Sequence, residues 1–230
     1  RMIDGLALLQ MKVENGRIDS SDIKQKWADD SQYNYETEDD FDETVTKKLA
    51  KEISTGEYRF YYFGDAEDGS MKTGRQTVDI DGDSFTFKFK DSSSSKGAGI
   101  HGEDDHKLYL AGKLIEADAD DKYQVVVYEE TKEGTITMTK MDTDEFLDAY
   151  TDEQPENEDG DIVWKVQAGQ SFKMTSAEKE KADAADVVGR HLYLVHTSGS
   201  MVKNKSAAKD GEDYKFNVDD YEIVDVTLEN

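Results

Sequence analysis

Alternating apolar and polar residues define short strands along most of the chain, and the most aromatic of them is the segment 59–63, RFYYF. Aromatic and β-branched residues suit a pleated, half-buried surface, so this pattern predicts a β-strand. Asp68-Gly69 follows it, and Gly accepts the positive φ that a tight hairpin turn requires. We therefore expect a hairpin in which 59–63 is the first strand and the returning strand begins at Met71.

A second hairpin is predicted directly after the first. The segments 77–80 and 84–89 both alternate, and Asp81-Gly82 between them supplies the turn. Side chains two residues apart share one face of a strand, so the three phenylalanines of 84–89 lie on the same face. Phe87, the middle one of the three, is expected to be buried.

The same pattern of residues recurs near the C-terminus. Gly-Ser-Met occurs at 69–71 and again at 199–201, and Tyr193 stands where the first copy has Tyr61. Phe216 likewise stands where the first copy has Phe87. A third, shorter copy of the pattern covers 108–114. A single hairpin is marginally stable in water, so repeated hairpins are expected to stack on one another and bury their aromatic residues.

Helical periodicity is clearest in one segment. Four apolar residues recur at every fourth position from Phe41 to Ile53, with Asp39 or Asp40 as the N-cap and Gly56 at the C-terminal end, which predicts an amphipathic helix. Shorter helices are expected at 142–150 and 176–186, and further strands at 123–128, 135–141, 162–166 and 221–228. The predicted fold class is mainly β with minor α, in which stacked β-hairpin repeats pack with one or two amphipathic helices.

The densest run of acidic residues divides the chain. Residues 151–160, TDEQPENEDG, include the only proline, and proline among charged residues is typical of a linker or a surface loop. We therefore expect an N-terminal strand and helix segment at 1–56, a first hairpin-repeat lobe at 57–150 and a second lobe at 161–230.

The composition excludes several classes of partner. Acidic residues outnumber basic ones by 53 to 28 in 230 residues, so the formal net charge is −25, and neither nucleic acid nor an anionic membrane surface is expected to bind. No apolar run is long enough for membrane insertion, and the 12 Tyr and 9 Phe argue against a disordered chain. The absence of cysteine excludes disulfides and thiolate metal sites. The chain begins at Arg1 rather than Met, and we interpret it as a mature or trimmed fragment that lacks its signal peptide.

The aromatic strand and the residues after it resemble the cell-wall-binding, choline-binding-type repeats of Gram-positive surface proteins. Residues 60–63, FYYF, stand where those repeats carry Trp-Tyr-Tyr-Phe, and residues 68–74, DGSMKTG, match their turn and returning strand. The resemblance covers 57–130 and 190–218, with degenerate repeats. It implies stacked hairpins and an extracellular location, at the cell wall or cell surface.

One position departs from that family. Its repeats have Gly-Trp after the turn, whereas this chain has Gly74-Arg75 in the first copy and Asn204-Lys205 in the second. Choline is held in an aromatic cage through cation–π contacts, and a cationic side chain repels a quaternary ammonium. The resemblance therefore implies a bacterial cell-wall polymer or glycan as the partner, and we expect no choline cage.

Surface aromatic residues are the feature best suited to ligand binding. Successive side chains of a strand alternate between its two faces, so two of every four point away from any one core. The candidates for a platform on which sugar rings can lie are Phe60, Tyr61, Tyr62, Phe63 and Tyr193. The alternative is that a neighbouring hairpin or the predicted helix covers the second face, as in most repeat folds.

Two groups of residues are candidates for a metal site. His101 and His106 flank an acidic turn and could hold a divalent ion, while Asp79, Asp81 and Asp83 could hold calcium. The alternatives are two solvated histidines and an ordinary Asp-Gly hairpin turn, since neither group fits the EF-hand pattern. Calcium is the one cofactor that the sequence leaves open.

No motif selects an enzyme. The chain has neither a Gly-x-Ser-x-Gly nucleophile elbow nor a phosphate-binding loop, and 53 acidic residues make any carboxylate pair uninformative. The expected function is therefore a non-catalytic, extracellular module of the cell wall or cell surface that binds glycan or serves as a scaffold. The alternative is the accessory wall-binding part of a secreted hydrolase whose catalytic domain lies outside this chain.

Overall fold

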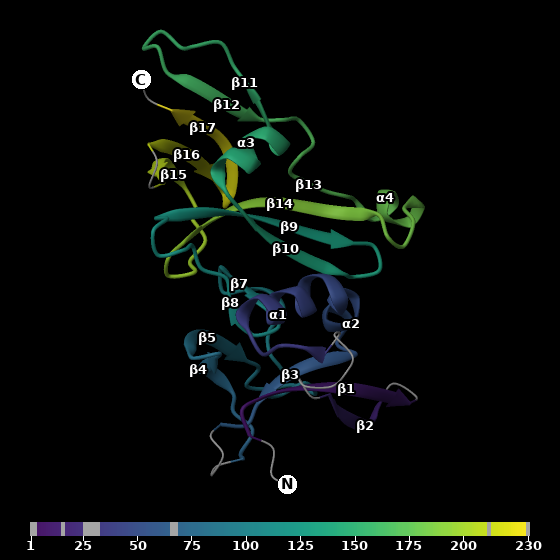
Figure 1. Cartoon of the computed structure of the whole chain (residues 1–230). Helices are drawn as coiled ribbons and strands as arrows, with labels where there is room; N and C mark the ends of the chain where they lie inside the picture. The colour runs from purple at the N-terminus through teal and green to yellow at the C-terminus, as the bar shows by residue number, and fades with distance from the viewer. Residues whose placement is uncertain (1–3, 15–16, 25–32, 65–68, 211–212, 229–230) are drawn as a thin grey trace. The chain divides into compact units, whose positions relative to one another are not determined.

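A computed structural model describes residues 4–14, 17–24, 33–64, 69–210 and 213–228 of the chain (Figure 1). The chain forms two compact units, which we describe separately. The first unit comprises Arg1–Leu114 and Gly134–Ile136, and the second comprises Ile115–Glu133 and Thr137–Asn230. The predicted boundary at 151–160 is therefore wrong.

The first unit begins with a three-stranded antiparallel sheet in the order β2-β1-β3, formed by β1 (Leu6–Glu14), β2 (Arg17–Lys24) and β3 (Tyr58–Tyr62). The predicted helix precedes β3. It is divided into α1 (Glu38–Glu43), a π-helical turn η2 (Thr44–Lys48) and α2 (Ala50–Thr55). Its N-cap is Thr37 rather than Asp39 or Asp40, because the Thr37 hydroxyl accepts the Asp40 amide. Gly56 ends it in the left-handed conformation, as predicted.

A five-stranded sheet completes the first unit. Its order is β4-β5-β8-β7-β6, with β4 at Gly74–Ile80, β5 at Asp83–Phe89, β6 at Gly102–Asp104, β7 at Lys107–Leu110 and β8 at Lys113–Leu114. The β4–β5 hairpin confirms the second predicted hairpin. Asp81 and Gly82 both take the positive φ of its two-residue turn, at 53° and 91°.

The core of the first unit is aromatic. Phe41 of α1 lies with its ring centroid 4.9 Å from that of Phe60 on β3 and 5.6 Å from that of Phe87 on β5. All three side chains are buried, and so are the other apolar residues of the predicted helix stripe. The stripe therefore packs against both sheets of the unit, which explains its four-residue spacing.

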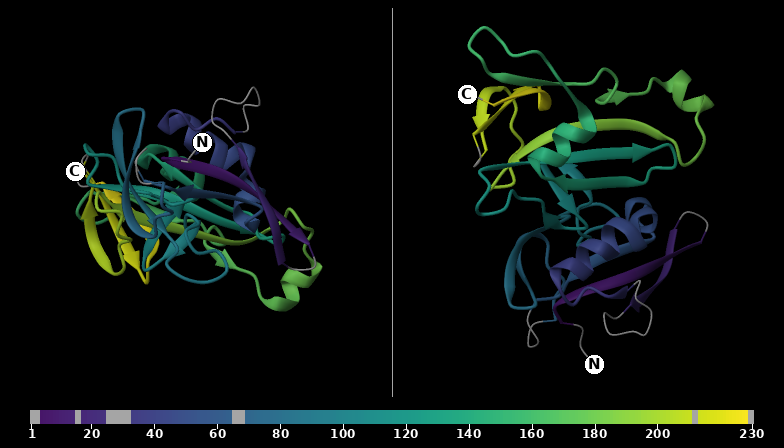
Figure 2. Two further views of the ribbon diagram at one scale, coloured as in Figure 1. Left: turned by 90° about the horizontal axis from the view of Figure 1, so that it is seen from below. Right: turned by 45° about the horizontal axis from the view of Figure 1, so that its top comes forward.

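The second unit is built on one large antiparallel sheet, whose long strands β9 (Tyr123–Thr131) and β14 (Val187–His196) lie side by side (Figure 2). The main path is β10-β9-β14-β17-β12-β11, β13 adds to β14, and β15-β16 adds to β17. The remaining strands are β10 (Ile136–Met141), β11 (Thr151–Glu153), β12 (Ile162–Val166), β13 (Phe172–Lys173), β15 (Lys205–Lys209), β16 (Tyr214–Asp219) and β17 (Glu222–Leu228). Its helices are α3 (Thr143–Tyr150) and α4 (Ser176–Lys181).

The core of the second unit lies between α3 and this sheet. Phe146 of α3 packs among buried side chains of the sheet that include Leu192, Leu194 and Phe216. Phe87 in the first unit and Phe216 in the second are both fully buried, as the repeat predicted.

The two units share part of their topology, although the second hairpin lies in a separate sheet in the first unit and joins the main sheet through β17 in the second. In each, a hairpin is followed by a helix and then by a strand that returns beside the first strand of the hairpin, which gives β2-β1-β3 in one unit and β10-β9-β14 in the other. The registers correspond as well, since Leu8 faces Phe60 and Val127 faces Leu192. A second hairpin then follows, β4–β5 or β15–β16.

The backbone after the third strand also corresponds. The Lys72 amide donates to the Tyr62 carbonyl at 2.7 Å, and the Val202 amide donates to the Leu194 carbonyl at 2.8 Å. These two bonds align Tyr61 with Tyr193, the equivalence that the sequence predicted. The repeat is therefore a structural unit that includes strands the sequence comparison did not reveal.

Two predicted details differ from the structure. β3 pairs with β1 rather than with a strand that begins at Met71, which is exposed and precedes β4; Asp68 lies outside the described residues. Of the two alternatives for the acidic run 151–160, the structure shows a loop rather than a linker between units, because the run forms β11 and the loop to β12 inside the second unit. The mainly β class with minor α is confirmed, with its hairpins distributed over two units.

Candidate functional site

Three ring side chains gather on the sheet of the second unit. His191 and Tyr193 lie two residues apart on β14, and Tyr128 of β9 is the cross-strand partner of His191. The His191 and Tyr193 rings are nearly parallel, at 3°, with centroids 5.4 Å apart, and Tyr128 lies 6.0 and 6.2 Å from them. We call these three residues the aromatic cluster.

Strand alternation places the cluster on the face opposite the core. Leu192 and Leu194 are fully buried against α3, so the residues between them point to the other side of the sheet. The three cluster residues are half-buried, which leaves part of each ring accessible. The sheet therefore presents aromatic surface where a ligand can reach it.

Glu222, at the start of β17, fixes the orientation of the histidine. One of its oxygens lies 2.5 Å from Nδ1 of His191, and the other accepts the Ser171 hydroxyl at 2.6 Å and the Leu192 amide at 3.0 Å. A carboxylate only accepts, so Nδ1 of His191 carries a proton and donates the hydrogen bond, which leaves Nε2 for a ligand. Nε2 can therefore form a hydrogen bond with a ligand hydroxyl, which both donates and accepts.

The protonation state of Glu222 supports this assignment. Burial by itself raises the pKa of its carboxyl, but the hydrogen bonds from His191, Ser171 and Leu192 outweigh burial, and the pKa lies below its ordinary value. Glu222 is therefore ionised at neutral pH, and its hydrogen bonds are charge-assisted.

The group of Ser171, Glu222 and His191 does not have the arrangement of a catalytic triad. In a triad the serine hydroxyl meets the imidazole, and the carboxylate stands behind it. Here the Ser171 hydroxyl donates to Glu222 instead. The geometry orients a histidine and does not activate a serine.

The residues predicted for ligand binding divide between core and surface. Phe60 is 1% exposed and Tyr61 8% exposed, so these two predictions are wrong; both rings pack inside the first unit. Tyr62 and Phe63 are half-buried, with Tyr62 stacked on Phe89 at 6.1 Å. Tyr193 belongs to the aromatic cluster.

Sequence patterns alone did not indicate a site at Tyr128, His191 and Glu222. His191 and Tyr193 could have been paired, because residues two positions apart on a strand share a face. Tyr128 and Glu222 come from β9 and β17, and only the sheet register brings them to β14.

The metal candidates do not converge. Within the part of the chain that the structure describes, no three His, Asp or Glu side chains form a group that could hold an ion. Asp79 accepts the Ser84 hydroxyl at 2.5 Å, Asp81 lies in the β4–β5 turn, and Asp83 begins β5. His106 is exposed, with Nδ1 3.8 Å from Glu103.

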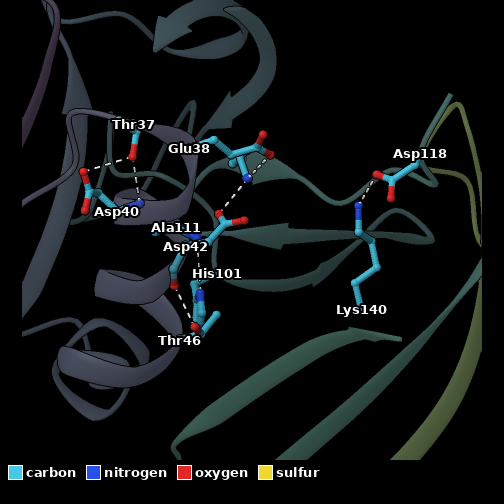
Figure 3. A network of polar contacts seen from close by, with 10 residues as sticks. Thr37, Glu38, Asp40, Asp42, Thr46, His101, Ala111, Asp118 and Lys140 are labelled. Carbon is cyan, nitrogen blue, oxygen red and sulfur yellow. Dashed lines mark hydrogen bonds and ion pairs between the residues drawn. The ribbon is translucent and has the colours of Figure 1, made fainter. Parts of the chain in front are cut away.

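His101 is unsuited to metal binding because both ring nitrogens are occupied. Nδ1 accepts the Ala111 amide at 3.2 Å (Figure 3), so the proton is on Nε2, which lies 3.1 Å from the Ile136 carbonyl. Burial lowers the pKa of this imidazole, although the hydrogen bond to Ile136 raises it in part. His101 is therefore a neutral structural residue.

Comparison of the chain with family models, with curated proteins and with solved structures finds no match. Among the described residues, no helix has both the length and the apolar character required to cross a membrane.

Proposed function

We propose that this chain is a non-catalytic, extracellular module of the bacterial cell wall or cell surface that binds a glycan through the aromatic cluster of the second unit. The observation that carries the proposal is the oriented His191 beside Tyr193 and Tyr128 on one half-buried face. The resemblance to cell-wall-binding repeats supports the location, and it includes Tyr193.

The chemistry of the cluster suits a sugar. Aromatic rings offer apolar surface to the C–H faces of a pyranose, while Nε2 of His191 forms a hydrogen bond with one of its hydroxyls. Glu222 acts as a positioning residue, since three of the roughly four acceptor sites of its carboxylate are already in use. Polar groups fixed in this way give a mostly apolar site its orientation and specificity.

The expected affinity follows from the size of the site. Ring contacts contribute about 0.5–1.5 kcal/mol each, and one hydrogen bond contributes about 1 kcal/mol. A single site should therefore bind a short glycan near ~1 mM, which corresponds to about 4 kcal/mol. Retention on an intact wall would be stronger, because several molecules or repeated sugars can be engaged at once.

The test is retention on purified Gram-positive cell walls, with and without calcium. The unchanged chain should be retained, and His191→Ala and Tyr193→Ala should each reduce the retained fraction at least about threefold, the loss of roughly 0.7 kcal/mol or more. His196→Ala is the matched control, because His196 lies on the same strand and contacts Ser198 rather than the cluster. Equal retention of the His191 and His196 variants would contradict the proposal.

A further inference from the structure

A cavity of about 170 Å³ lies within the first unit, away from the aromatic cluster in sequence and sheet. It is formed by the end of α2, by β3, by the loop that follows β5 and by residues near β6 and β7. The polar side chains that line it include Ser54, Arg59, Lys90, Ser95 and His101.

The charge of this lining is opposite to that of the chain. Asp and Glu make up 53 of 230 residues, so about three of the thirteen lining residues would be acidic on average. None of those that the structure describes is acidic. Glu57, which precedes the strand, is exposed, and its carboxylate accepts from Gln10 at 3.4 Å. The cavity is therefore a cationic site in a strongly anionic protein.

Arg59 supplies an unsatisfied donor. Its Nε donates to the Gly56 carbonyl at 2.9 Å, which fixes the guanidinium at the C-terminal end of α2. Its Nη1 is buried and has no hydrogen-bond partner among the described residues. A charged donor that is buried without a partner is costly, so a ligand that accepts this hydrogen bond gains free energy from it.

Lys90 is the second cation of the cavity. Its backbone is held at both ends, because its amide donates to the Ala98 carbonyl and its carbonyl accepts the Gly97 amide. Within the described part of the chain, neither Lys90 nor Arg59 forms an ion pair. His101 is neutral, since both of its ring nitrogens form hydrogen bonds with the backbone, and its side chain forms part of the cavity wall.

We propose that this cavity binds one oxyanion group, a carboxylate or a phosphate, between Arg59 and Lys90. The planar guanidinium of Arg59 presents donors that match the oxygens of either group, and the flexible ammonium of Lys90 adds a second positive charge. The volume fits such a group, given about 30 Å³ for a water molecule in the liquid. The proposal does not depend on glycan binding by the second unit.

The test is calorimetric titration of the full chain with sodium phosphate, sodium glucuronate and glucose. Ionic strength is kept constant with sodium chloride, because added salt screens the self-repulsion of a chain at −25. Saturable binding of phosphate, of glucuronate or of both is expected, and the stronger ligand identifies the natural group as a phosphate or as the carboxylate of an acidic sugar. Binding of neither, or equal binding of glucose, would overturn the proposal.

Variants assign the site. Arg59→Met and Lys90→Met should weaken oxyanion binding at least tenfold, and Lys96→Met should leave it unchanged. Lys96 is the matched control, because it is an exposed lysine of the same loop that does not line the cavity. An affinity of Arg59→Met equal to that of Lys96→Met would overturn the assignment.

A measurement on the unchanged chain covers the case in which Arg59→Met does not fold. Ala98, Gly99 and Ala111 line the cavity, and their backbone amides should shift in ¹⁵N-resolved NMR spectra as the oxyanion is added. Shifts confined to other residues would contradict the site. His191→Ala should leave oxyanion binding unchanged, which separates this proposal from the proposed glycan site.

Discussion

The ion pairs of Lys113 allow a local effect to be separated from the effect of net charge. Its Nζ lies 2.7 Å from the Glu38 carboxylate and 2.6 Å from the Asp42 carboxylate. Figure 3 shows these two acidic residues, which both belong to α1. The lysine side chain is 6% exposed, whereas the two carboxylates are 49% and 39% exposed. The same ammonium lies 5.2 Å from the ring centroid of Phe85. A buried cation is thus held by partners that water can reach.

Removal of both carboxylates should destabilise the first unit. Glu38→Gln with Asp42→Asn leaves the ammonium buried without a counter-charge, a change that costs roughly 3–5 kcal/mol in buried pairs. Solvent already screens the exposed carboxylates in part, so we expect the free energy of unfolding to fall by about 3 kcal/mol. If repulsion among the acidic residues dominated, the double variant would instead be more stable, because removing two negative charges brings the net charge from −25 to −23.

Removal of the lysine should cost much less. In Lys113→Met the methionine side chain fills the space of the lysine stem, and solvent can hydrate both carboxylates. Replacement of a buried ion pair by apolar side chains often leaves the stability unchanged. The repulsion left between Glu38 and Asp42, four residues apart on α1, is worth a few tenths of a kcal/mol. We therefore expect a change within about 1 kcal/mol.

Urea unfolding followed by far-UV circular dichroism measures both variants, and hydrogen exchange of β5 and β8 assigns the loss to the first unit. The reasoning predicts that the double carboxylate variant is the less stable of the two. A larger loss for Lys113→Met would refute it and would indicate that net charge, rather than burial of the ammonium, dominates.

Three further predictions concern the core, the buried histidine and choline. Phe87→Ala should destabilise the first unit by roughly 3–5 kcal/mol, because it empties a fully buried aromatic position beside Phe41; urea unfolding measures the loss, and a change below about 1 kcal/mol would contradict the packing. The pKa of His101 is lowered in the folded state, so the unfolded chain binds the proton more readily and stability should fall as the pH drops below about 6.5. His101→Gln, which can keep both backbone hydrogen bonds, should reduce this dependence between about pH 6.5 and 5, and an unchanged slope would contradict it. Free choline at millimolar concentration should not elute the chain specifically from a choline matrix, because Arg75 stands where the resembling family has tryptophan; specific elution would show that other aromatic residues form a cage.

Local patterns predicted the elements that depend on neighbouring residues. The β4–β5 hairpin follows from Asp81-Gly82 between two alternating strands, and the helix stripe from Phe41 to Ile53 follows from its spacing. The burial of Phe87 and of Phe216 likewise follows from alternation within one strand. In each case the interactions that decide the structure lie within about ten residues of one another.

Long-range pairing was the part that the sequence did not reveal. The partner of β3 is β1, some fifty residues earlier, and apolar strands such as these can pair with several others. That pairing buries Phe60 and Tyr61, which the sequence had offered as a binding surface. The aromatic cluster likewise depends on the register of β9 and β14, so its members could not be combined from the sequence.

The shared topology also explains why the repeat looked shorter than it is. The two units correspond in the order of hairpin, helix, strand and hairpin, but the second carries β11, β12, β13 and α4 between its helix and its third strand. The hairpin and helix of each unit retain only their apolar pattern. The sequence revealed the repeat only in the third strand, around Gly-Ser-Met and in the hairpin that follows.

The central claim is that a glycan binds at the aromatic cluster. The most direct measurement is NMR of the full chain with ¹³C-labelled tyrosine and histidine rings, titrated with soluble fragments of cell-wall glycan. The account predicts saturable shifts of the His191, Tyr193 and Tyr128 rings, and none for Tyr61, which packs in the first unit. Shifts of Tyr61 without those of His191 and Tyr193, or no shift of any labelled ring, would contradict it.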